Sequence, residues 1–148
     1  MKSGEVQNNF VFDAEEYISQ MGMKYSSAKM IPKNSVVMAM YGATASQVCY
    51  LLFNTTTNQA CCNMTCDSLE KSYFLYFHLR NIQADIKKLA NGGAQENLNQ
   101  ELIISQKIIS APNECYLPFL KIGDYISVVT NENLQLRKFL TILTSKLS

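Results

Sequence analysis

The sequence predicts an α+β fold, in which a small, twisted, mostly antiparallel sheet with packed helices is followed by one long C-terminal helix. Three observations predict it. Two short apolar runs of β-type composition lie at 36–40 and 48–53. A helical apolar period runs through residues 72–89, and a second, longer one runs from 119 to 147. The 148 residues suffice for one domain that buries roughly two-thirds of its unfolded surface.

The composition is that of a globular protein, with 47% apolar and 17% charged residues. The net charge of +1 lacks the strong basic excess that would by itself indicate a nucleic-acid-binding protein. Any contact with phosphate must therefore come from local clusters or from the surface of a partner. The first nine residues are polar, and no apolar run approaches the roughly 20 residues of a membrane span. The five cysteines are an odd number, so we expect a reduced, cytoplasmic protein with no membrane contact.

The N-terminal region gives the weakest signals. We expect residues 1–12 to be a loose start. Residues 13–23 suit either a short helix or an extended stretch, with Tyr17 and Ile18 as its apolar anchors. Pro32 then opens a turn that extends to residue 35.

The two β-type runs flank a loop of small residues, 41–46, and are expected to pair as a hairpin with a long loop. A polar turn at 54–57 follows, and residues 58–64 are expected to form a third strand.

The clearest helix in the first part of the chain covers residues 72–89. Asp67 and Glu70 have the spacing of a reciprocal N-terminal cap. Its apolar residues recur at alternating intervals of four and three, which places them on one stripe: Leu75, Leu79, Ile82, Ile86 and Leu89. The glycines at 92 and 93 would end it. A single turn at 98–102 and a strand at 107–110 are expected to follow.

The last segment has the most regular pattern. Its apolar positions keep a strict three-four spacing over four heptads, which is typical of a coiled-coil seam: Phe119, Ile122, Ile126, Val129, Asn133, Leu136, Leu140, Leu143 and Leu147. Asn133 is the one polar member, and a buried amide at such a position can fix the register of two helices. The alternative is an ordinary amphipathic helix that packs on its own domain.

No pattern for catalysis or cofactor binding is present. His78 lies off the apolar stripe and has no orienting partner or nucleophile near it in sequence. Neither a phosphate-binding glycine loop nor a dinucleotide fingerprint occurs. Cys61, Cys62 and Cys66 lack a second pair at zinc-site spacing and are expected to be small apolar residues of a buried strand. We therefore expect a protein that is not an enzyme and needs no cofactor or metal.

Several segments, taken together and in this order, resemble the specificity subunit of type I restriction-modification systems. Each is weak alone, but the ordered set covers nearly the whole chain: Tyr17-Ile18, 29–37, 41–48, 57–60, the helix at 72–89, 90–99, 107–112, 131–140 and Lys146-Leu147.

This resemblance implies a division into two domains. Residues 1–113 would be a target recognition domain, and residues 114–148 a coiled-coil helix of the conserved spacer region. In the family, two recognition domains are held apart by an antiparallel pair of long helices, and each reads one half of a split DNA site. The family's recognition domain has further strands before the position of Tyr17, so we expect this one to be N-terminally truncated.

The resemblance also implies partners and a site. The expected partners are double-stranded DNA, the modification methyltransferase subunit, the restriction subunit as a further candidate, and a second copy through the C-terminal helix. The polar loops and nearby lysines give the candidate DNA-binding residues: Tyr41, Thr44, Ser46, Gln47, Lys29, Lys33, Gln95, Asn97 and Asn99. Asn58 and Gln59 are weaker candidates, since their amides can instead satisfy backbone groups. The expected helix interface consists of Ile126, Val129, Asn133, Leu136, Leu140 and Leu143.

An alternative function belongs to a different class. The chain would then be an assembly module, which docks to the methyltransferase or to another specificity chain through the helix and does not read DNA itself. A small enzyme is a third and much less favoured hypothesis.

Overall fold

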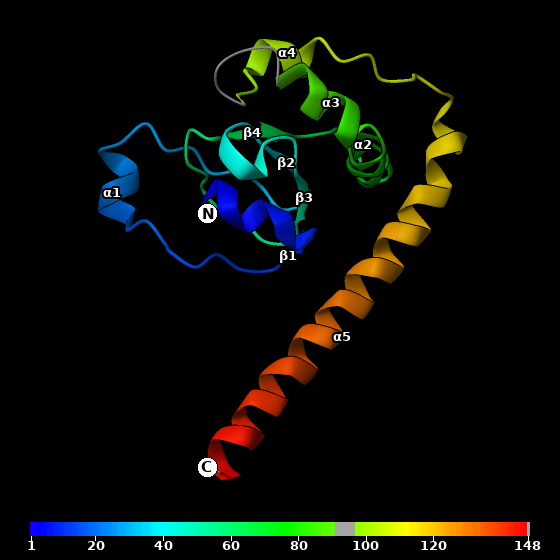
Figure 1. Ribbon diagram of the computed structural model, residues 1–148. Helices are drawn as coiled ribbons and strands as arrows, with labels where there is room; N and C mark the ends of the chain where they lie inside the picture. The colour runs from blue at the N-terminus through cyan, green and yellow to red at the C-terminus, as the bar shows by residue number, and fades with distance from the viewer. Residues whose placement is uncertain (91–96, 148) are drawn as a thin grey trace.

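The structure is a computed structural model that describes residues 1–90 and 97–147, and it has the α+β architecture that the sequence predicts. A four-stranded sheet lies between helical segments on both faces, and one long helix leaves the domain (Figure 1). None of the helices within the described residues is both long enough and apolar enough to cross a membrane.

The sheet has the strand order β1-β3-β2-β4. The central pair, β2 (Val36–Ala39) and β3 (Val48–Leu51), is antiparallel, which confirms the predicted hairpin. β4 (Cys61–Met64) pairs antiparallel with the other side of β2, so the third strand is confirmed over its second half. β1 (Phe10–Val11) lies parallel to β3 at the opposite edge.

Both faces of the sheet are covered, which explains why β2 and β3 are apolar without alternation. On one face Val36, Met38 and Tyr50 pack against three helices, which are α2 (Leu69–Asn81), α3 (Gln83–Ala90) and α4 (Gln100–Ile104). On the other face Val37 and Cys49 contact the N-terminal segment. The domain thus has two cores separated by one sheet.

The expectation of a loose N-terminus is wrong. Residues Ser3–Asn8 form a 3-10 helix, η1, and its Val6 is fully buried against the sheet. β1 follows at once. The partner of β1 is β3, about forty residues further along the chain, so the local pattern gave no sign of the pairing.

Between residues 13 and 23 the chain is first irregular and then helical, so the expected short helix is present only at the end of this range. The helix is short, α1 (Gln20–Lys24), and begins at Ser19, whose hydroxyl accepts a hydrogen bond from the Gly22 amide. Tyr17 and Ile18 do not anchor it, because their exposed fractions are 71% and 40%.

The helix expected at 72–89 is divided into α2 (Leu69–Asn81) and α3 (Gln83–Ala90). The Ile82 carbonyl accepts a hydrogen bond from the Asp85 amide, which starts the second helix in a new direction. Ser68, and not Asp67, caps α2, because its hydroxyl accepts the Lys71 amide while Asp67 pairs with the Lys71 ammonium. The stop expected at residues 92–93 lies outside the described residues.

The predicted turn at 98–102 is the helix α4 (Gln100–Ile104), capped by Asn99. The strand expected at 107–110 is absent: these residues form an irregular connection with exposed Ile108 and Ile109. An apolar run forms a strand only where a neighbouring strand is in place to pair with it by hydrogen bonds. A 3-10 turn, η3 (Asn113–Tyr116), leads into α5 (Leu117–Leu147).

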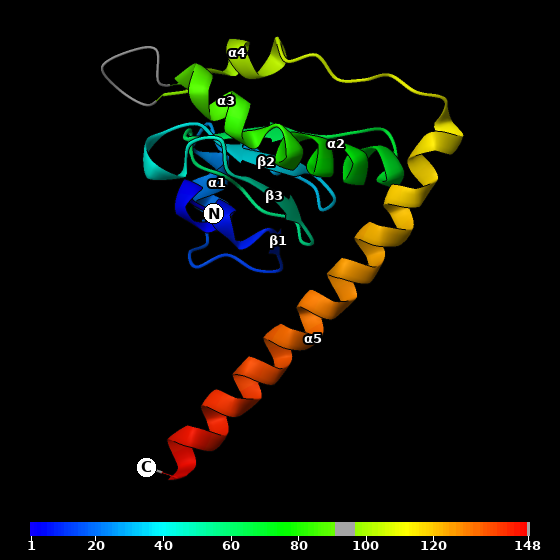
Figure 2. The same ribbon diagram turned by 45° about the vertical axis from the view of Figure 1, so that its right-hand side comes forward.

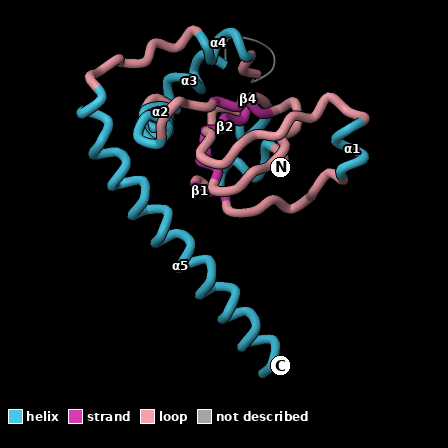
Figure 3. The backbone as a smooth tube through the Cα atoms, turned by 180° about the vertical axis from the view of Figure 1, so that it is seen from behind, coloured by secondary structure: helices cyan, strands magenta, loops and turns pink. Residues whose placement is uncertain are grey.

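α5 has two halves with different surroundings (Figures 1 and 2). Its first half packs on α2: Phe119 contacts Phe74 with ring centroids 5.1 Å apart, and Gly123 is buried beneath Tyr73. The Tyr73 hydroxyl donates to Asp124 Oδ1 at 3.0 Å. The second half runs away from the helices that cover the sheet, as the view from behind also shows (Figure 3).

Candidate nucleic-acid interface

Three segments that are far apart in sequence meet where β2 ends. The Met40 amide donates to the Ala60 carbonyl at 2.8 Å, and the Met40 carbonyl accepts the Leu98 amide at 2.8 Å. Tyr41 forms an isolated antiparallel bridge with Asn97. The loop at 41–47, the turn at 58–60 and the segment at 97–99 therefore form one surface, which we call the β2-end surface.

The loop that begins at Tyr41 is held by its own backbone. η2 (Gly42–Thr44) opens at Gly42, whose φ of +71° is a conformation that glycine adopts without strain. The amide of Ala45 donates to the Gly42 carbonyl, and that of Gln47 donates to the Thr44 carbonyl, each at 2.9 Å. These bonds fix which side chains face outward.

Most of the expected loop residues reach the surface. Tyr41 is 41% exposed, and Thr44 and Gln47 are half-buried. Ser46 is fully buried with a φ of +71°, and its hydroxyl has no hydrogen-bond partner among the described residues. The Ser46 side chain therefore does not face solvent in this conformation.

The second expected turn is only partly described. Gln95 lies outside the described residues. Asn97 is exposed beside Tyr41, whereas the Asn99 side chain accepts the Leu102 amide at 2.7 Å and so caps α4. The sequence did not indicate that Asn97 and Tyr41 are neighbours. The only hint is Leu98, an isolated apolar residue among amides, which is fully buried.

The two expected lysines lie apart. Lys33 belongs to the turn at the start of β2, where its amide donates to Asn54 Oδ1 at 2.8 Å. It is therefore at the opposite end of β2 from Tyr41. Lys29 instead lines an open groove with Asn58 and Gln59, next to Ala60 of the β2-end surface. Asn63, which sequence reasoning missed, lines the same groove.

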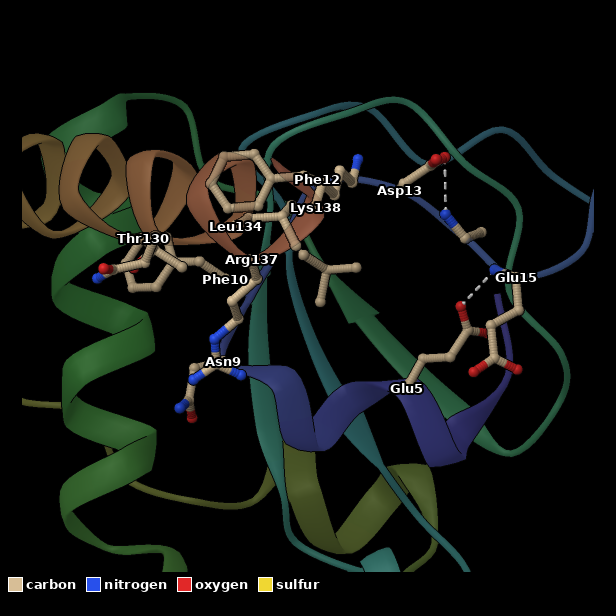
Figure 4. A pocket seen from close by; sticks show the side chains of 13 residues that line it. Glu5, Asn9, Phe10, Phe12, Asp13, Glu15, Thr130, Leu134, Arg137 and Lys138 are labelled. Carbon is tan, nitrogen blue, oxygen red and sulfur yellow. Dashed lines mark hydrogen bonds between the residues drawn. The ribbon is translucent and has the colours of Figure 1, made fainter. Parts of the chain in front are cut away.

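A larger open groove, about 840 Å³, separates the N-terminal segment from α5. One wall carries Thr130, Leu134, Arg137 and Lys138 of α5, and the other carries Glu5, Asp13 and Glu15 (Figure 4). The Glu5 carboxylate is already used, since it accepts the amides of Lys2 and Glu15. The groove carries three carboxylates against the two cationic side chains of Arg137 and Lys138, and carboxylates repel phosphate, so it suits DNA less well than the β2-end surface does.

The expected helix interface is partly uncovered in the single chain. Ile126 is half-buried and packs on the core that contains α2, Val129 is half-buried, and Asn133 is exposed. Leu136, Leu140 and Leu143 are 60%, 59% and 41% exposed. Phe139 and Ile142 are exposed beside them. The outer half of α5 thus presents a continuous apolar stripe to solvent.

His78 and the cysteines of β4, which were considered as catalytic or metal-binding residues, lie in packed surroundings. His78 stacks on Phe74 with centroids 5.7 Å apart, and its Nε2 is buried without a hydrogen-bond partner among the described residues. Burial raises the pKa of the Cys61 thiol to about 11 and also raises the pKa values of Cys62 and Cys66. Such thiols stay protonated near neutral pH, which does not suit nucleophilic attack. Across residues 1–90 and 97–147, no three acidic, cysteine or histidine side chains group as metal ligands would.

Comparison with known protein families gives the class of the protein. Residues 2–140 match the family model described as the type I restriction modification DNA specificity domain. The match covers almost the whole chain, so the chain belongs to this family. The description of this family assigns it DNA specificity in type I restriction-modification systems, and the resemblance noted from the sequence is confirmed.

Proposed function

We propose that this chain reads one half of a split DNA site through the β2-end surface, while α5 pairs with another helix to hold the complex together. The observation that carries the proposal is the bridge between Tyr41 and Asn97, with the flanking bond from the Leu98 amide to the Met40 carbonyl. It joins two polar loops from different parts of the chain on one exposed edge. Such an edge can present several side chains to the same few base pairs.

The chemistry of this surface suits base edges. Gln47 and Asn97 each carry a side-chain amide, which can donate and accept at once, as an adenine edge requires. Tyr41 and Thr44 add hydroxyls. The backbone bonds within the loop hold these groups in place before DNA arrives, which reduces the entropy lost on binding. Ser46 is not in the proposed contact set because its side chain is buried.

The experiment is duplex selection from a randomised pool with the full chain, followed by fluorescence-anisotropy titration of the selected duplex. Tyr41→Ala and Gln47→Ala should each weaken binding to the selected duplex by roughly five- to a hundred-fold, which corresponds to 1–3 kcal/mol. Their affinity for unrelated duplexes should change little.

Tyr125→Ala is the control, because Tyr125 is also exposed and belongs to α5, outside the β2-end surface. Circular dichroism verifies that each variant is folded. The proposal is overturned if the selected duplex binds the Tyr41 and Gln47 variants as tightly as the unchanged chain.

The second candidate function is an assembly module without DNA reading, and the exposed stripe on α5 favours it. The expected partners are the methyltransferase subunit, the restriction subunit or a second copy in the cytoplasm. Co-purification with the methyltransferase subunit without retained DNA would support this alternative. Tight binding of a selected duplex that resists competition by unrelated DNA would support the reading function.

A further inference from the structure

A second groove, of about 480 Å³, lies between the segment that follows α1 and the loop that precedes β4. Its lining is neutral or cationic: Ile18, Ser26, Ser27, Ala28, Lys29, Ile31, Thr57, Asn58, Gln59 and Asn63. The larger groove beside α5, in contrast, carries three carboxylates. The smaller groove is therefore the one in which an anion meets no like charge from the wall.

The groove is held by bonds that do not involve its exposed donors. The amides and carbonyls of Ile31 and Thr55 pair with each other, at 2.7 and 3.0 Å, and fix the two walls together. On the inner wall, Asn63 Nδ2 donates to Thr57 Oγ1 at 2.8 Å. The exposed Lys29 ammonium makes no ion pair within the part of the chain that the structure describes. It remains available to a ligand.

The groove meets the β2-end surface at the turn formed by residues 58–60. Gln59 lines it, and the next residue, Ala60, accepts the Met40 amide one residue before Tyr41. A nucleic-acid strand whose bases face Tyr41 and Asn97 extends beyond these two residues, and one of its directions leads past residues 58–60 into the groove. On this side it meets hydroxyls, amides and one ammonium, which are the groups that usually contact phosphate and sugar.

We propose that this groove holds the sugar–phosphate backbone of one DNA strand, with Lys29 neutralising one phosphate beside the bases read at the β2-end surface. The inference rests on the proposed function and adds to it the place where the strand is held. Asn58 and Gln59 act there as backbone contacts and not as readers of base sequence.

The test measures how the affinity of the full chain for its selected duplex depends on salt. Lys29→Ala should lower the slope of log Kd against log salt by about one, because one fewer counterion is released per complex. The affinity that Lys29→Ala loses should be similar for the selected duplex and for unrelated duplexes. Lys121→Ala is the matched control, since Lys121 is exposed on the first turns of α5, and its slope should be unchanged.

A second measurement identifies the phosphate. Duplexes with a single neutral methylphosphonate are scanned along one strand with the unchanged chain and with Lys29→Ala. At one position the methylphosphonate should weaken DNA binding by the unchanged chain and leave DNA binding by Lys29→Ala unaffected. A slope that Lys29→Ala does not alter, or a scan with no such position, overturns the inference.

The two proposals fail in different ways. If the full chain binds its selected duplex and Tyr41→Ala weakens it, while Lys29→Ala has no effect on the salt slope, only the groove is wrongly assigned. If no duplex is retained at any salt concentration, the proposed function fails and the groove assignment fails with it.

Discussion

At Gly123 the backbone of α5 lies directly against the Tyr73 ring of the domain. A Cβ built at this position would lie 2.2 Å from Cδ1 of Tyr73, a distance that real contacts do not show. Tyr73 in turn stacks on Tyr50 of β3, with ring centroids 4.4 Å apart and planes 10° apart. Two rings therefore connect the central sheet to the helix backbone, and the absence of a side chain at residue 123 makes this possible.

Replacement of Gly123 by Ala should destabilise the domain by about 1–3 kcal/mol, although alanine is the better helix former, because overpacking outweighs propensity here. The free energy of unfolding in urea measures the effect. Gly4→Ala is the control, since a Cβ at Gly4 meets nothing within 4 Å. Equal stabilities for the two variants would show that α5 does not rest on Tyr73 as described.

The buried thiols predict a loss of stability in alkali. Desolvation raises the pKa of Cys61 from 9.0 to about 11 and raises that of Cys49 further. Above pH 9 the unfolded chain releases these protons while the folded chain keeps them. The free energy of unfolding should therefore fall as pH rises from 9 to 11, by about 2–3 kcal/mol for Cys61.

Urea unfolding at pH 8 and pH 10 tests this expectation, with Cys61→Ala as the comparison. The variant should lose less stability between the two pH values than the unchanged chain. An identical pH dependence in both would mean that Cys61 ionises equally well in the folded and unfolded states.

At the scale of elements, the outer half of α5 leaves a run of large apolar side chains exposed in the single chain, among them Leu136, Phe139 and Leu140. Leu136→Lys combined with Leu140→Lys should abolish any association through the helix, because each lysine would place a charge in an apolar contact. Sedimentation of the chain alone, and of the chain mixed with the methyltransferase subunit, measures this association.

The control places the same charges on another side of α5, with Thr141→Lys and Ser145→Lys. These positions are exposed and lie outside the predicted seam. Association should survive in this variant. Loss of association in both variants would point to general charge effects and not to the stripe.

The elements that the sequence predicts well are those whose signals are local. The β2–β3 hairpin and α5 follow from periodicity and from one intervening loop. η1 and β1 were missed because their partners lie about forty residues away. Residues 107–110 have the composition of a strand but meet no strand, so composition misled there. The division at residue 113 stays a prediction.

The candidate site shows the same limit. Its loops were identified from polar residues and turn signals, but the contact of Tyr41 with Asn97 depends on the path of the chain through α2, α3 and the segment between them. No spacing in the sequence encodes it. The burial of Ser46 could not be foreseen either, because it follows from a positive φ in a short loop.

At the scale of the whole molecule, the protruding α5 makes the chain elongated (Figure 2). A compact protein of this length has a radius of gyration of about 15 Å. Small-angle X-ray scattering at concentrations where sedimentation shows a single chain should give a clearly larger value. A value near that of a compact protein would mean that the outer half of α5 folds back onto the domain.

The packing at Gly123 also has a mechanical consequence. From that residue to the end of α5 the helix extends for about 36 Å at 1.5 Å per residue. A tilt of about 10° at the Tyr73 contact would shift the far end by roughly 6 Å, about the pitch of one helical turn. The rigidity of the Tyr50–Tyr73 ring pair therefore limits the angular motion of α5. It also limits how far a partner bound at the C-terminal end of α5 can move relative to the sheet.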